Sequence, residues 1–536
     1  MANNFPVKTL VTALSLAVAT TALAAAPSAS ASRTMVAAHA TRLHTGDIVS
    51  GPMNLSQIMR VSVSLQLRNE AQLRAFIANP DHPNLTQAQF TAQYGPSEAD
   101  ANAVAAWLKQ HGFSDIAISS NRLLVSATAP AATVQSAFHT NVVRVHTHDG
   151  RNAFANSTDV SIPASLRGVS GVLGLQTVHV PHIAKGKPGG GGGSIIGHNP
   201  TQFPSIYGGA SLPTAAGVTV GIISNGDLTQ TLSDLDTFTS QGGLSTVTTQ
   251  IVNTGGTGTD TSGTPEWDLD SQDIVGMGGG QVGKIVFYNI PTLLNSSMVA
   301  DFNTVVNANV AKVINVSLGE CEVYAEQDGS AAAADALFQQ ADAQGQTFSV
   351  SSGDSGSNEC RGAGKSGSGG PKGTTPSWPA SSPYVVAVGG TTLNATTTTW
   401  QGETVWSGTG GSPSTFEPIP SWQVGVGRNA GSQYRGVPDI AFDADPNSGA
   451  IIIVNGSPAQ YGGTSLSSPL FVGFWARMIA AKGTGIGFAA PKLYQLPATA
   501  FHDVTSGSNG AESAAPGWDY CTGFGSIIMS QAATSL

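Results

Sequence analysis

The sequence is poor in cysteine, charge and aromatic residues for its length. It has three cysteines among 536 residues, and charged and aromatic residues make up 10% and 7% of the chain. So few cysteines exclude a small disulfide scaffold, and no Cys-x-x-Cys or Cys/His cluster indicates zinc. Apolar residues make up 40% of the chain and recur throughout it, which predicts a large folded core and two domains.

The sequence also lacks an apolar run long enough to span a membrane. An early run at residues 10–19 follows Lys8 and precedes the small-residue segments 22–24 and 29–31. This pattern is typical of a secretory signal peptide, which we place at residues 1–31. A membrane anchor, the alternative, needs about 20 apolar residues. We therefore expect a secreted protein, extracellular or periplasmic, that does not bind membranes.

Charge is divided unequally along the chain. Residues 1–198 hold 13 Lys and Arg against 8 Asp and Glu, a net charge of +5, and residues 199–536 hold 10 against 25, a net charge of −15. Between them, KGKPGGGGGS (185–194) has the composition of a flexible, cleavable linker. We expect attraction between the two parts that weakens as carboxylates are protonated. The overall acidity argues against nucleic acid as a partner.

The part before the linker has the pattern of a small α+β domain. Helical spacing marks residues 70–77 and 97–113, the second helix beginning at Ser97. Strands are expected at 61–68, within 116–127 and at 141–147. Nine of the eleven histidines precede the linker; they are scattered along the sequence, so a solvated, titrating role is expected for them.

The part after the linker alternates short apolar strands with helices, which predicts a parallel sheet covered on both faces. Strands are expected at 218–224, 284–290, 312–318, 346–352 and 384–390, and helices at 266–277, at 328–344 and after Ser465. In such sheets the functional residues gather at the carboxyl ends of strands and the helix starts that follow. Cys321 and Cys360 both follow expected strand ends and can form a disulfide, whereas Cys521 is expected to be a buried free thiol.

The segment YGGTSLSSP (461–469) contains the Gly-Thr-Ser sequence that surrounds the nucleophile of subtilisin-type serine peptidases, here Ser465. Such a serine needs a base, which is usually histidine. No histidine lies between residues 199 and 464, and His502 lies beyond the serine. A Ser-His triad is therefore disfavoured, and the base is expected to be a carboxylate.

Three carboxylates are candidates. Glu266 and Asp270 are four residues apart in an expected helix, so both project from one face, where two like charges are favourable only if they share a proton. The alternative is an ordinary solvated helix face that also includes Asp268 and Asp273. Asp354 follows an apolar strand and, when protonated, can donate to a developing oxyanion. The alternative for Asp354 is an Asx-turn.

Together these segments resemble the sedolisins, or serine-carboxyl peptidases, of the kumamolisin and xanthomonalisin type. Residues 79–97 are similar to the activation prodomain, EWDLD (266–270) to the Glu-x-x-x-Asp helix motif, SSGDSG (351–356) to the oxyanion aspartate motif, and GGTSLSSP (462–469) to the serine motif. The resemblance implies a prodomain at 32–184, a cleavable linker at 185–198 and a peptidase domain at 199–536. The implied fold is an α/β, subtilisin-like doubly wound parallel sheet preceded by a ferredoxin-like prodomain.

The resemblance also implies the roles of the residues. Ser465 would be the nucleophile, Glu266 its general base, Asp270 the group that orients Glu266 and shares its proton, and Asp354 the oxyanion donor. The protein would be a zymogen that cleaves proteins and peptides and is inhibited by its own prodomain. No segment of the sequence indicates an oligomer interface, so a monomer is expected. Because an unperturbed glutamate has a pKa near ~4.3, we expect an optimum below neutral pH.

A structural Ca²⁺ site is implied near the C-terminus. Its ligands would be the carboxylates of Asp503 and Asp519 and the carbonyls of Val504, Ala515 and Gly517, a set of oxygens that suits Ca²⁺. Ala515 stands where relatives often have glycine, and two aspartates in a glycine-rich surface loop are the alternative.

Two other functions stay open at this point. The chain could be a non-catalytic binding protein, a pseudo-peptidase on the same scaffold. It could also be a glycosidase that uses two acids without the serine, although the sparse aromatic residues disfavour sugar binding.

Overall fold

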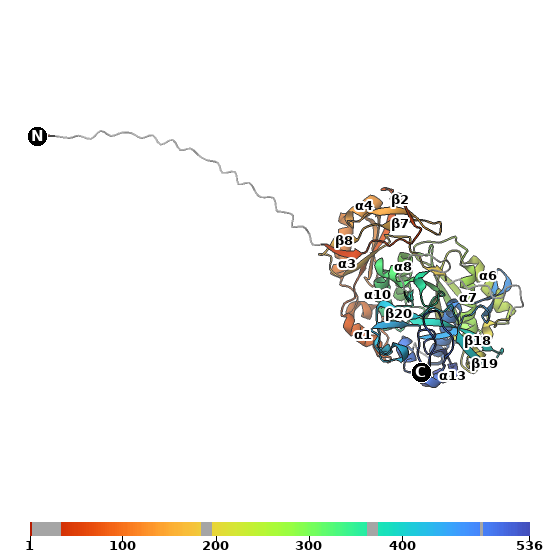
Figure 1. Ribbon diagram of the computed structural model, residues 1–536. Helices are drawn as coiled ribbons and strands as arrows, with labels where there is room; N and C mark the ends of the chain where they lie inside the picture. The colour runs from red at the N-terminus through yellow and green to blue at the C-terminus, as the bar shows by residue number, and fades with distance from the viewer. Residues whose placement is uncertain (3–33, 184–195, 362–372, 483–485) are drawn as a thin grey trace.

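The computed structural model describes residues 1–2, 34–183, 196–361, 373–482 and 486–536 (Figure 1). The predicted signal peptide, from residue 3 onward, and the linker up to residue 195 lie outside the described residues. None of the helices in the described residues is both long and apolar enough to cross a membrane.

The part before the linker is an α+β domain built on a four-stranded antiparallel sheet. The sheet order is β4 (Ser114–Ile118), β5 (Leu124–Pro130), β3 (Ile58–Leu65) and β9 (Val169–Leu173). The crossing helices are α1 (Glu70–Ala78), α2 (Gln87–Gln93), α3 (Glu98–Gln110) and α4 (Ala131–Ala137). Taken in chain order the four strands lie 2-3-1-4, the arrangement of a split βαβ unit, which confirms the ferredoxin-like prediction. Ser97 caps α3 by accepting from the backbone N–H of Asp100, as expected.

Two smaller sheets complete this domain. One has the order β2 (Ile48–Pro52), β6 (Val142–His146) and β7 (Asn152–Asn156), and the other pairs β1 (Thr34–Ala38) with β8 (Val160–Pro163).

The part after the linker is built on an eight-stranded sheet. Its order is β12 (Thr249–Asn253), β13 (Val282–Ile290), β11 (Ala215–Asn225), β14 (Val313–Val316), β16 (Thr347–Ser351), β18 (Val386–Ala395) and β19 (Trp400–Val405), with β22 (Ile440–Asp443) also pairing β18. Every pair is parallel except β18 with β19. This is the subtilisin-like parallel sheet that was expected.

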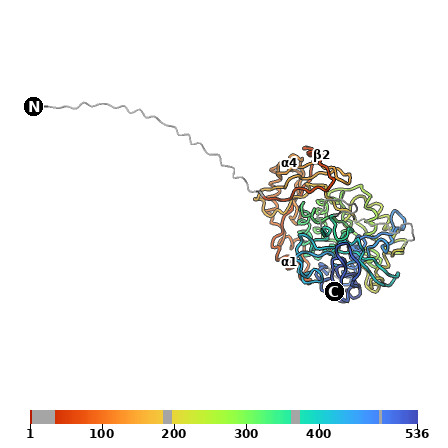
Figure 2. Tube along the Cα trace, in the orientation of Figure 1, coloured from red at the N-terminus to blue at the C-terminus, as the bar shows by residue number. Residues whose placement is uncertain are grey.

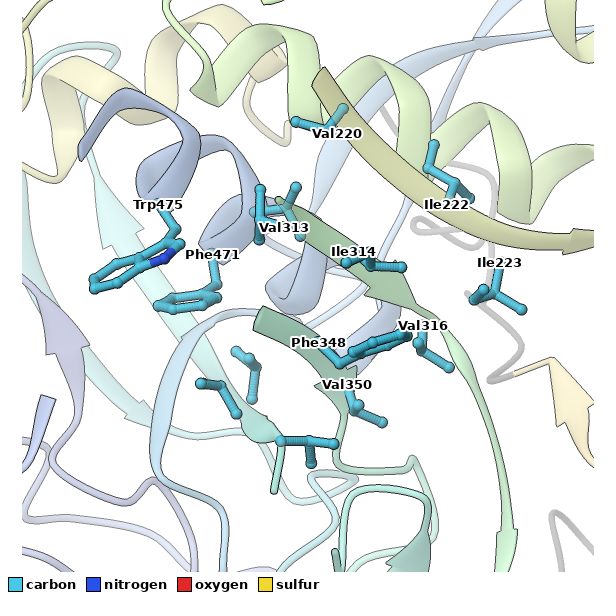
Figure 3. Packing of buried hydrophobic residues seen from close by; sticks show 14 of the residues in the cluster. Val220, Ile222, Ile223, Val313, Ile314, Val316, Phe348, Val350, Phe471 and Trp475 are labelled. Carbon is cyan, nitrogen blue, oxygen red and sulfur yellow. The ribbon is translucent and has the colours of Figure 1, made fainter. Parts of the chain in front are cut away.

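Two groups of helices pack on the sheet, and their apolar side chains fill the core. One group is α6 (Thr229–Gln241), α7 (Thr264–Met277) and α11 (Thr464–Lys482), and the other is α8 (Asn295–Ala308) and α10 (Ser330–Ala343). Figure 3 shows Phe471 and Trp475 of α11 beside Val313 of the central strands. Strands β14 (VINV) and β16 (TFSVS) are buried along their whole length. Their polar residues are hydrogen-bonded inside the protein, as Asn315 is to Ser317 and Ser349 to Ser468.

The strand expected at 312–318 is interrupted, which corrects the sequence-based prediction. It ends as β14 at Val316, and after Ser317 the chain continues as β15 (Leu318–Cys321) in a different, three-stranded sheet. The neighbours of β15 there are β10 (His182–Ile183) and β17 (Ser377–Trp378), both antiparallel to it. Ser317 is thereby placed at the carboxyl end of a central strand.

The two parts of the chain are packed together. Figure 2 shows the orange trace of the part before the linker, where α1, α4 and β2 are labelled, lying beside the green trace from the middle of the chain. Helix α1 contacts α10, and the Asn121 side chain donates to Asn303 of α8 at 2.9 Å and to Gln340 of α10 at 2.7 Å. The prediction that the histidines before the linker are solvated is wrong for His82 and His179, which are both buried; His179 is 4% exposed because it lies in this interface.

The cysteines are arranged as predicted. Cys321 at the end of β15 forms a disulfide with Cys360, and Cys521 is a buried free thiol.

Candidate active site

Four elements bring the predicted catalytic residues together. Glu266 and Asp270 lie on α7, Ser465 lies in the first turn of α11, and α7 packs closely against α11. Ser317 follows β14 and contacts Asp270, and Asp354 follows β16 and contacts the residue before Ser465. The site therefore forms at the carboxyl ends of two adjacent central strands, where a parallel sheet is expected to place it.

Helix α7 is buried on all sides, which overturns the alternative of a solvated helix face. Every residue from Glu266 to Met277 is buried, and Asp268 and Asp273 are 0% exposed. A helix apolar or buried all round belongs to the interior of a protein. The carboxyl groups on α7 thus lie in a protein interior, where charge is expensive and protonation is the usual response.

The Glu266 and Asp270 carboxyls behave as a pair that holds protons. Burial raises the pKa of both well above the ordinary value, and the negative charge of Asp270 raises that of Glu266 further. A hydrogen bond between the Glu266 and Ser465 side chains acts in the opposite direction and lowers the Glu266 pKa. One oxygen on each carboxyl, Glu266 Oε1 and Asp270 Oδ2, has no hydrogen-bond partner among the described residues. These features fit a proton shared by the pair.

Two polar residues beside the pair were missed by the sequence reasoning. The Ser317 hydroxyl donates to Asp270 Oδ1 at 2.7 Å, and hydrogen bonds from Ser317 and Asn315 lower the Asp270 pKa against the effect of burial. The Asn315 side chain also donates to Ser317 Oγ at 2.9 Å. The available signal was the presence of two small polar residues inside an otherwise apolar strand.

Asp354 is tied to the residue that precedes the candidate nucleophile. Its Oδ1 accepts from the Thr464 backbone N–H at 2.8 Å and from the Thr464 hydroxyl at 2.9 Å, while Thr464 Oγ1 accepts from the Gly353 N–H. This network favours a positioned side chain over the Asx-turn alternative. Burial raises the pKa of Asp354 to about 6, so the group is protonated in moderate acid and can then donate a hydrogen bond.

His502 packs against an aromatic side chain and contacts none of the candidate catalytic residues among the described residues. It lies in the short strand β25 (Phe501–His502) and stacks on Trp400 of β19, with ring centroids 3.8 Å apart and 6° between the planes. Burial lowers the pKa of the His502 imidazole to about 4. Its ring is therefore engaged by an aromatic neighbour.

The residues expected to bind Ca²⁺ lie in one loop region. Asp503 Oδ2 accepts from the Gly517 N–H at 2.9 Å, and Asp519 Oδ2 accepts from the Ala515 N–H at 2.7 Å. The other Asp519 oxygen accepts from the backbone after it, at Cys521 and Thr522.

The donor set of this loop fits a hard cation in composition. The carbonyls of Val504, Ala515 and Gly517 accept none of the hydrogen bonds formed by the described residues. Gly517 has φ of +76°, whereas Ala515 is not among the residues with positive φ, so its side chain is compatible with the backbone there. Among the described residues, no group of three or more His, Cys, Asp or Glu side chains is placed to hold a metal, so a cation here would depend on backbone carbonyls.

Comparison with known proteins agrees with this geometry. Residues 46–178 match the family model of the pro-kumamolisin activation domain, and residues 273–518 match that of the subtilase family. The chain is 44% identical to sedolisin of Pseudomonas sp. (strain 101) over 88% of this chain and 86% of that protein. The chain belongs to the sedolisin family.

Two further comparisons extend this result. The chain is 44% identical to xanthomonalisin of Xanthomonas sp. (strain T-22) over 88% of its own length, and it spans 64% of the length of that relative. A solved structure described as Pseudomonas sedolisin, a serine-carboxyl proteinase complexed with two molecules of pseudo-iodotyrostatin, matches with 47% identity and a TM-score of 0.60. That match covers 64% of this chain and 98% of the solved chain. As a sedolisin with an activation domain, the chain is a peptidase precursor.

The limits of the subtilase match are informative. The matched segment begins at residue 273, after Glu266 and Asp270, and it includes Asp354 and Ser465. The carboxyl pair thus lies in the part of this sedolisin outside the segment that matches subtilases in general.

Proposed function

We propose that this sedolisin is a secreted, acid-acting endopeptidase that cleaves proteins through an acyl-enzyme on Ser465. The observation that carries the proposal is the placement of the Ser465 hydroxyl against a buried carboxyl pair, Glu266 and Asp270, with no histidine between residues 199 and 464. The Glu266 carboxyl group is then the base for Ser465, because the two side chains are hydrogen-bonded to each other.

The chemical steps follow from the arrangement of these groups. Glu266 accepts the proton of the Ser465 hydroxyl as its oxygen attacks the substrate carbonyl, and Asp270 shares the proton that Glu266 gains. The protonated Asp354 carboxyl donates to the oxygen that becomes negative in the tetrahedral intermediate. Return of the proton to the amine expels the leaving group, and water then hydrolyses the ester by the same route.

The pH range follows from the protonation states that these roles require. Asp354 donates only while protonated, and its pKa is raised to about 6, so the donor is lost as pH rises above that value. Glu266 must be able to accept a proton, which the hydrogen bond from Ser465 favours by lowering its pKa against the effect of burial. We therefore expect activity in acid and a decline above about pH 6.

The activation domain would inhibit the enzyme by occupying the substrate cleft. Strand β10 (His182–Ile183), at the end of that domain, pairs antiparallel with Leu318 and Gly319 of β15, directly after Ser317. A peptide substrate that adds a strand to β15 would need the same edge. Removal of this segment, with weakening of the charge attraction in acid, would free the cleft for protein substrates.

A bound Ca²⁺ would stabilise the C-terminal loops. It would be held by Asp503, Asp519 and the carbonyls of Val504, Ala515 and Gly517, and it would supply structure and no chemistry to the reaction. The three carbonyls that accept no other described hydrogen bond support this assignment.

The test is digestion of casein or haemoglobin from pH 2 to pH 8 by the acid-treated precursor and by its Ser465→Ala variant. We expect cleavage in acid that is lost with Ser465. Cleavage by both proteins, or cleavage at pH 8 with none at pH 4, would contradict the mechanism, and no cleavage by either would indicate a pseudo-peptidase.

Sequencing the N-terminus of the exported protein tests the proposed secretion and monitors loss of the activation domain. Gel filtration of the matured enzyme tests whether it is a monomer.

A further inference from the structure

A cluster of rings lies where the activation domain meets the peptidase part. His44 and His179 of the activation domain both pack on Tyr324 of α9 (Glu322–Gln327). The His179 ring is stacked on the Tyr324 ring, with centroids 3.8 Å apart and 8° between the planes. The His44 ring meets both edge-on, at 4.7 Å from His179 and 5.0 Å from Tyr324. His179 and Tyr324 are buried, at 4% and 5% exposure.

The hydrogen bonds in this cluster form a chain whose direction is fixed by chemistry. His179 Nε2 lies 2.6 Å from the Arg42 carbonyl oxygen, which can only accept, so Nε2 carries the proton. In a neutral imidazole Nδ1 is then an acceptor, and it lies 3.1 Å from His44 Nε2, which must donate. His44 Nδ1 therefore accepts from the Tyr324 hydroxyl at 3.3 Å. The complete chain requires both imidazoles to be neutral.

Protonation of both imidazoles in acid would break this chain of hydrogen bonds. A proton on His179 Nδ1 would face the N–H of His44 across the 3.1 Å contact, so both rings cannot be protonated without separating. Burial, together with the nearness of His44, lowers the pKa of His179 to about 3, and burial lowers that of His44. In the released domain both rings return to solvent, where a histidine has a pKa near ~6.5.

The charged groups around the rings partly offset one another. Asp47 raises the pKa of both histidines, and Arg151 lowers both. Asp149 raises and His148 lowers the pKa of His44, while Arg42, Asp47 and Glu320 act on Tyr324. The Asp47 carboxylate is itself engaged, because it accepts from the His148 ring at 2.9 Å and from the His44 backbone N–H at 2.8 Å. Burial remains the largest influence on the two histidines.

Through His179, the ring cluster lies next in sequence to β10, the strand proposed to occupy the substrate cleft. His179 precedes His182 of β10 by three residues, and His182 Nε2 contacts Glu359 Oε1 at 2.8 Å. Tyr324 packs with the disulfide between Cys321 and Cys360, which joins the end of β15 to the segment after Asp354. Separation of the rings would therefore loosen the activation domain beside the substrate cleft.

We propose that His44, His179 and Tyr324 form an acid-operated latch, which holds the activation domain on the peptidase part at neutral pH and opens when both imidazoles are protonated. The inference rests on the proposed function, to which it adds the trigger for maturation. The sign is set by linkage: the open form binds more protons than the closed form, so opening is favoured as pH falls below ~6.5. From pH 7 to pH 4, the pKa difference of His179 alone shifts the equilibrium on the order of 100-fold towards opening.

Interface carboxyls act with the opposite sign. Asp328, which accepts from Gln176 of the activation domain at 2.8 Å, has a pKa raised by burial, so its proton is retained in the closed form. Protonation of Asp328 in acid therefore favours the closed form, whereas protonation of His44 and His179 favours release.

The latch can be tested without peptidase activity. Small-angle scattering of the full-length Ser465→Ala precursor, titrated from pH 7 to pH 3.5, should show the radius of gyration rising as the domain opens. His44→Gln removes one titrating ring, because glutamine can accept from Tyr324 and donate to His179 at any pH. His44→Gln with His179→Phe removes both and keeps an aromatic ring on Tyr324. Both variants should open at a lower pH than the parent, the double variant by one pH unit or more.

The matched control is His139→Asn. His139 is exposed and has φ of +49°, a conformation that asparagine tolerates. The pH at which the His139→Asn variant is half open should equal that of the parent. An unchanged midpoint in His44→Gln, or a parent that stays closed at pH 3.5, would overturn the latch. If the double variant is already open at pH 7, the single variant decides. If the acid-treated precursor that retains Ser465 does not digest casein, the proposed function is refuted instead. The failure of the latch and the failure of the proposed function are therefore distinguishable.

Discussion

Replacing Asp268 with asparagine should stabilise the protein at neutral pH and leave it nearly unchanged in acid. Asp268 is 0% exposed on α7, and neither of its oxygens has a hydrogen-bond partner among the described residues. It lies close to Asp234 of α6, which accepts from the backbone N–H groups of Asn455 and Gly456. Burial, with the nearby Asp234 charge, raises the pKa of Asp268 to about 9.

The magnitude follows from linkage. Below the unfolded-state pKa of ~3.9 both states are protonated, so the group costs nothing; above it the unfolded state loses a proton that the folded state keeps. Stability therefore falls by ~1.4 kcal/mol per pH unit between ~3.9 and the folded pKa, or about 4 kcal/mol at pH 7. An asparagine at this position has no proton to lose and keeps a donor that can face Asp234.

The assay is scanning calorimetry of the Ser465→Ala precursor at pH 4 and pH 7, with and without Asp268→Asn. The variant should raise Tm by several degrees at pH 7 and by little at pH 4. Asp236→Asn, an exposed change on α6, is the control and should have no effect at either pH. An equal Tm for Asp268→Asn and its parent at pH 7 would refute the reasoning.

Three further changes have defined outcomes. In Asp354→Asn the amide donates at every pH, so the decline of kcat/KM above pH 6 should move to higher pH. Asp354→Ala removes the donor and should lose on the order of 10²–10³ in kcat across the pH range. Equal pH profiles in these two variants would contradict the donor role. Chelation with EGTA should lower the Tm of the parent and leave that of Asp503→Asn or Asp519→Asn unaffected, and a parent indifferent to EGTA would argue against Ca²⁺. Replacing Cys321 and Cys360 with alanine should cost roughly 4 kcal/mol for a loop spanning 39 positions, measured as a lower unfolding free energy, and full stability of the variant would show that the disulfide contributes nothing.

The order of the elements could be predicted because each carries a local pattern. Strands β14 and β16 carry β-branched and aromatic residues, and α3 follows Ser97, whose side chain caps it. The end of β14 could not be predicted in this way. Leu318 continues the apolar pattern past Ser317, and only pairing with β10 and β17 draws the chain out of the main sheet.

The candidate catalytic residues could be predicted from the sequence because each lies in a short motif, and the structure brings them together. Their surroundings could not be predicted in this way. Asp268 and Asp273 look like members of a solvated face until the packing of α6 and α11 around α7 is known. The ring cluster joins residues 44, 179 and 324, whose separation in sequence leaves no local signal.

The central claim is that Ser465 is a nucleophile activated by a carboxyl group. The most direct measurement is mass spectrometry of the matured enzyme after incubation with a peptide aldehyde at pH 4, which mimics the tetrahedral intermediate when the hydroxyl adds to it. We predict an adduct on Ser465 that is absent from Ser465→Ala and strongly reduced in Glu266→Gln, which cannot accept the proton. An adduct on another residue, or full labelling of Glu266→Gln, would contradict the account.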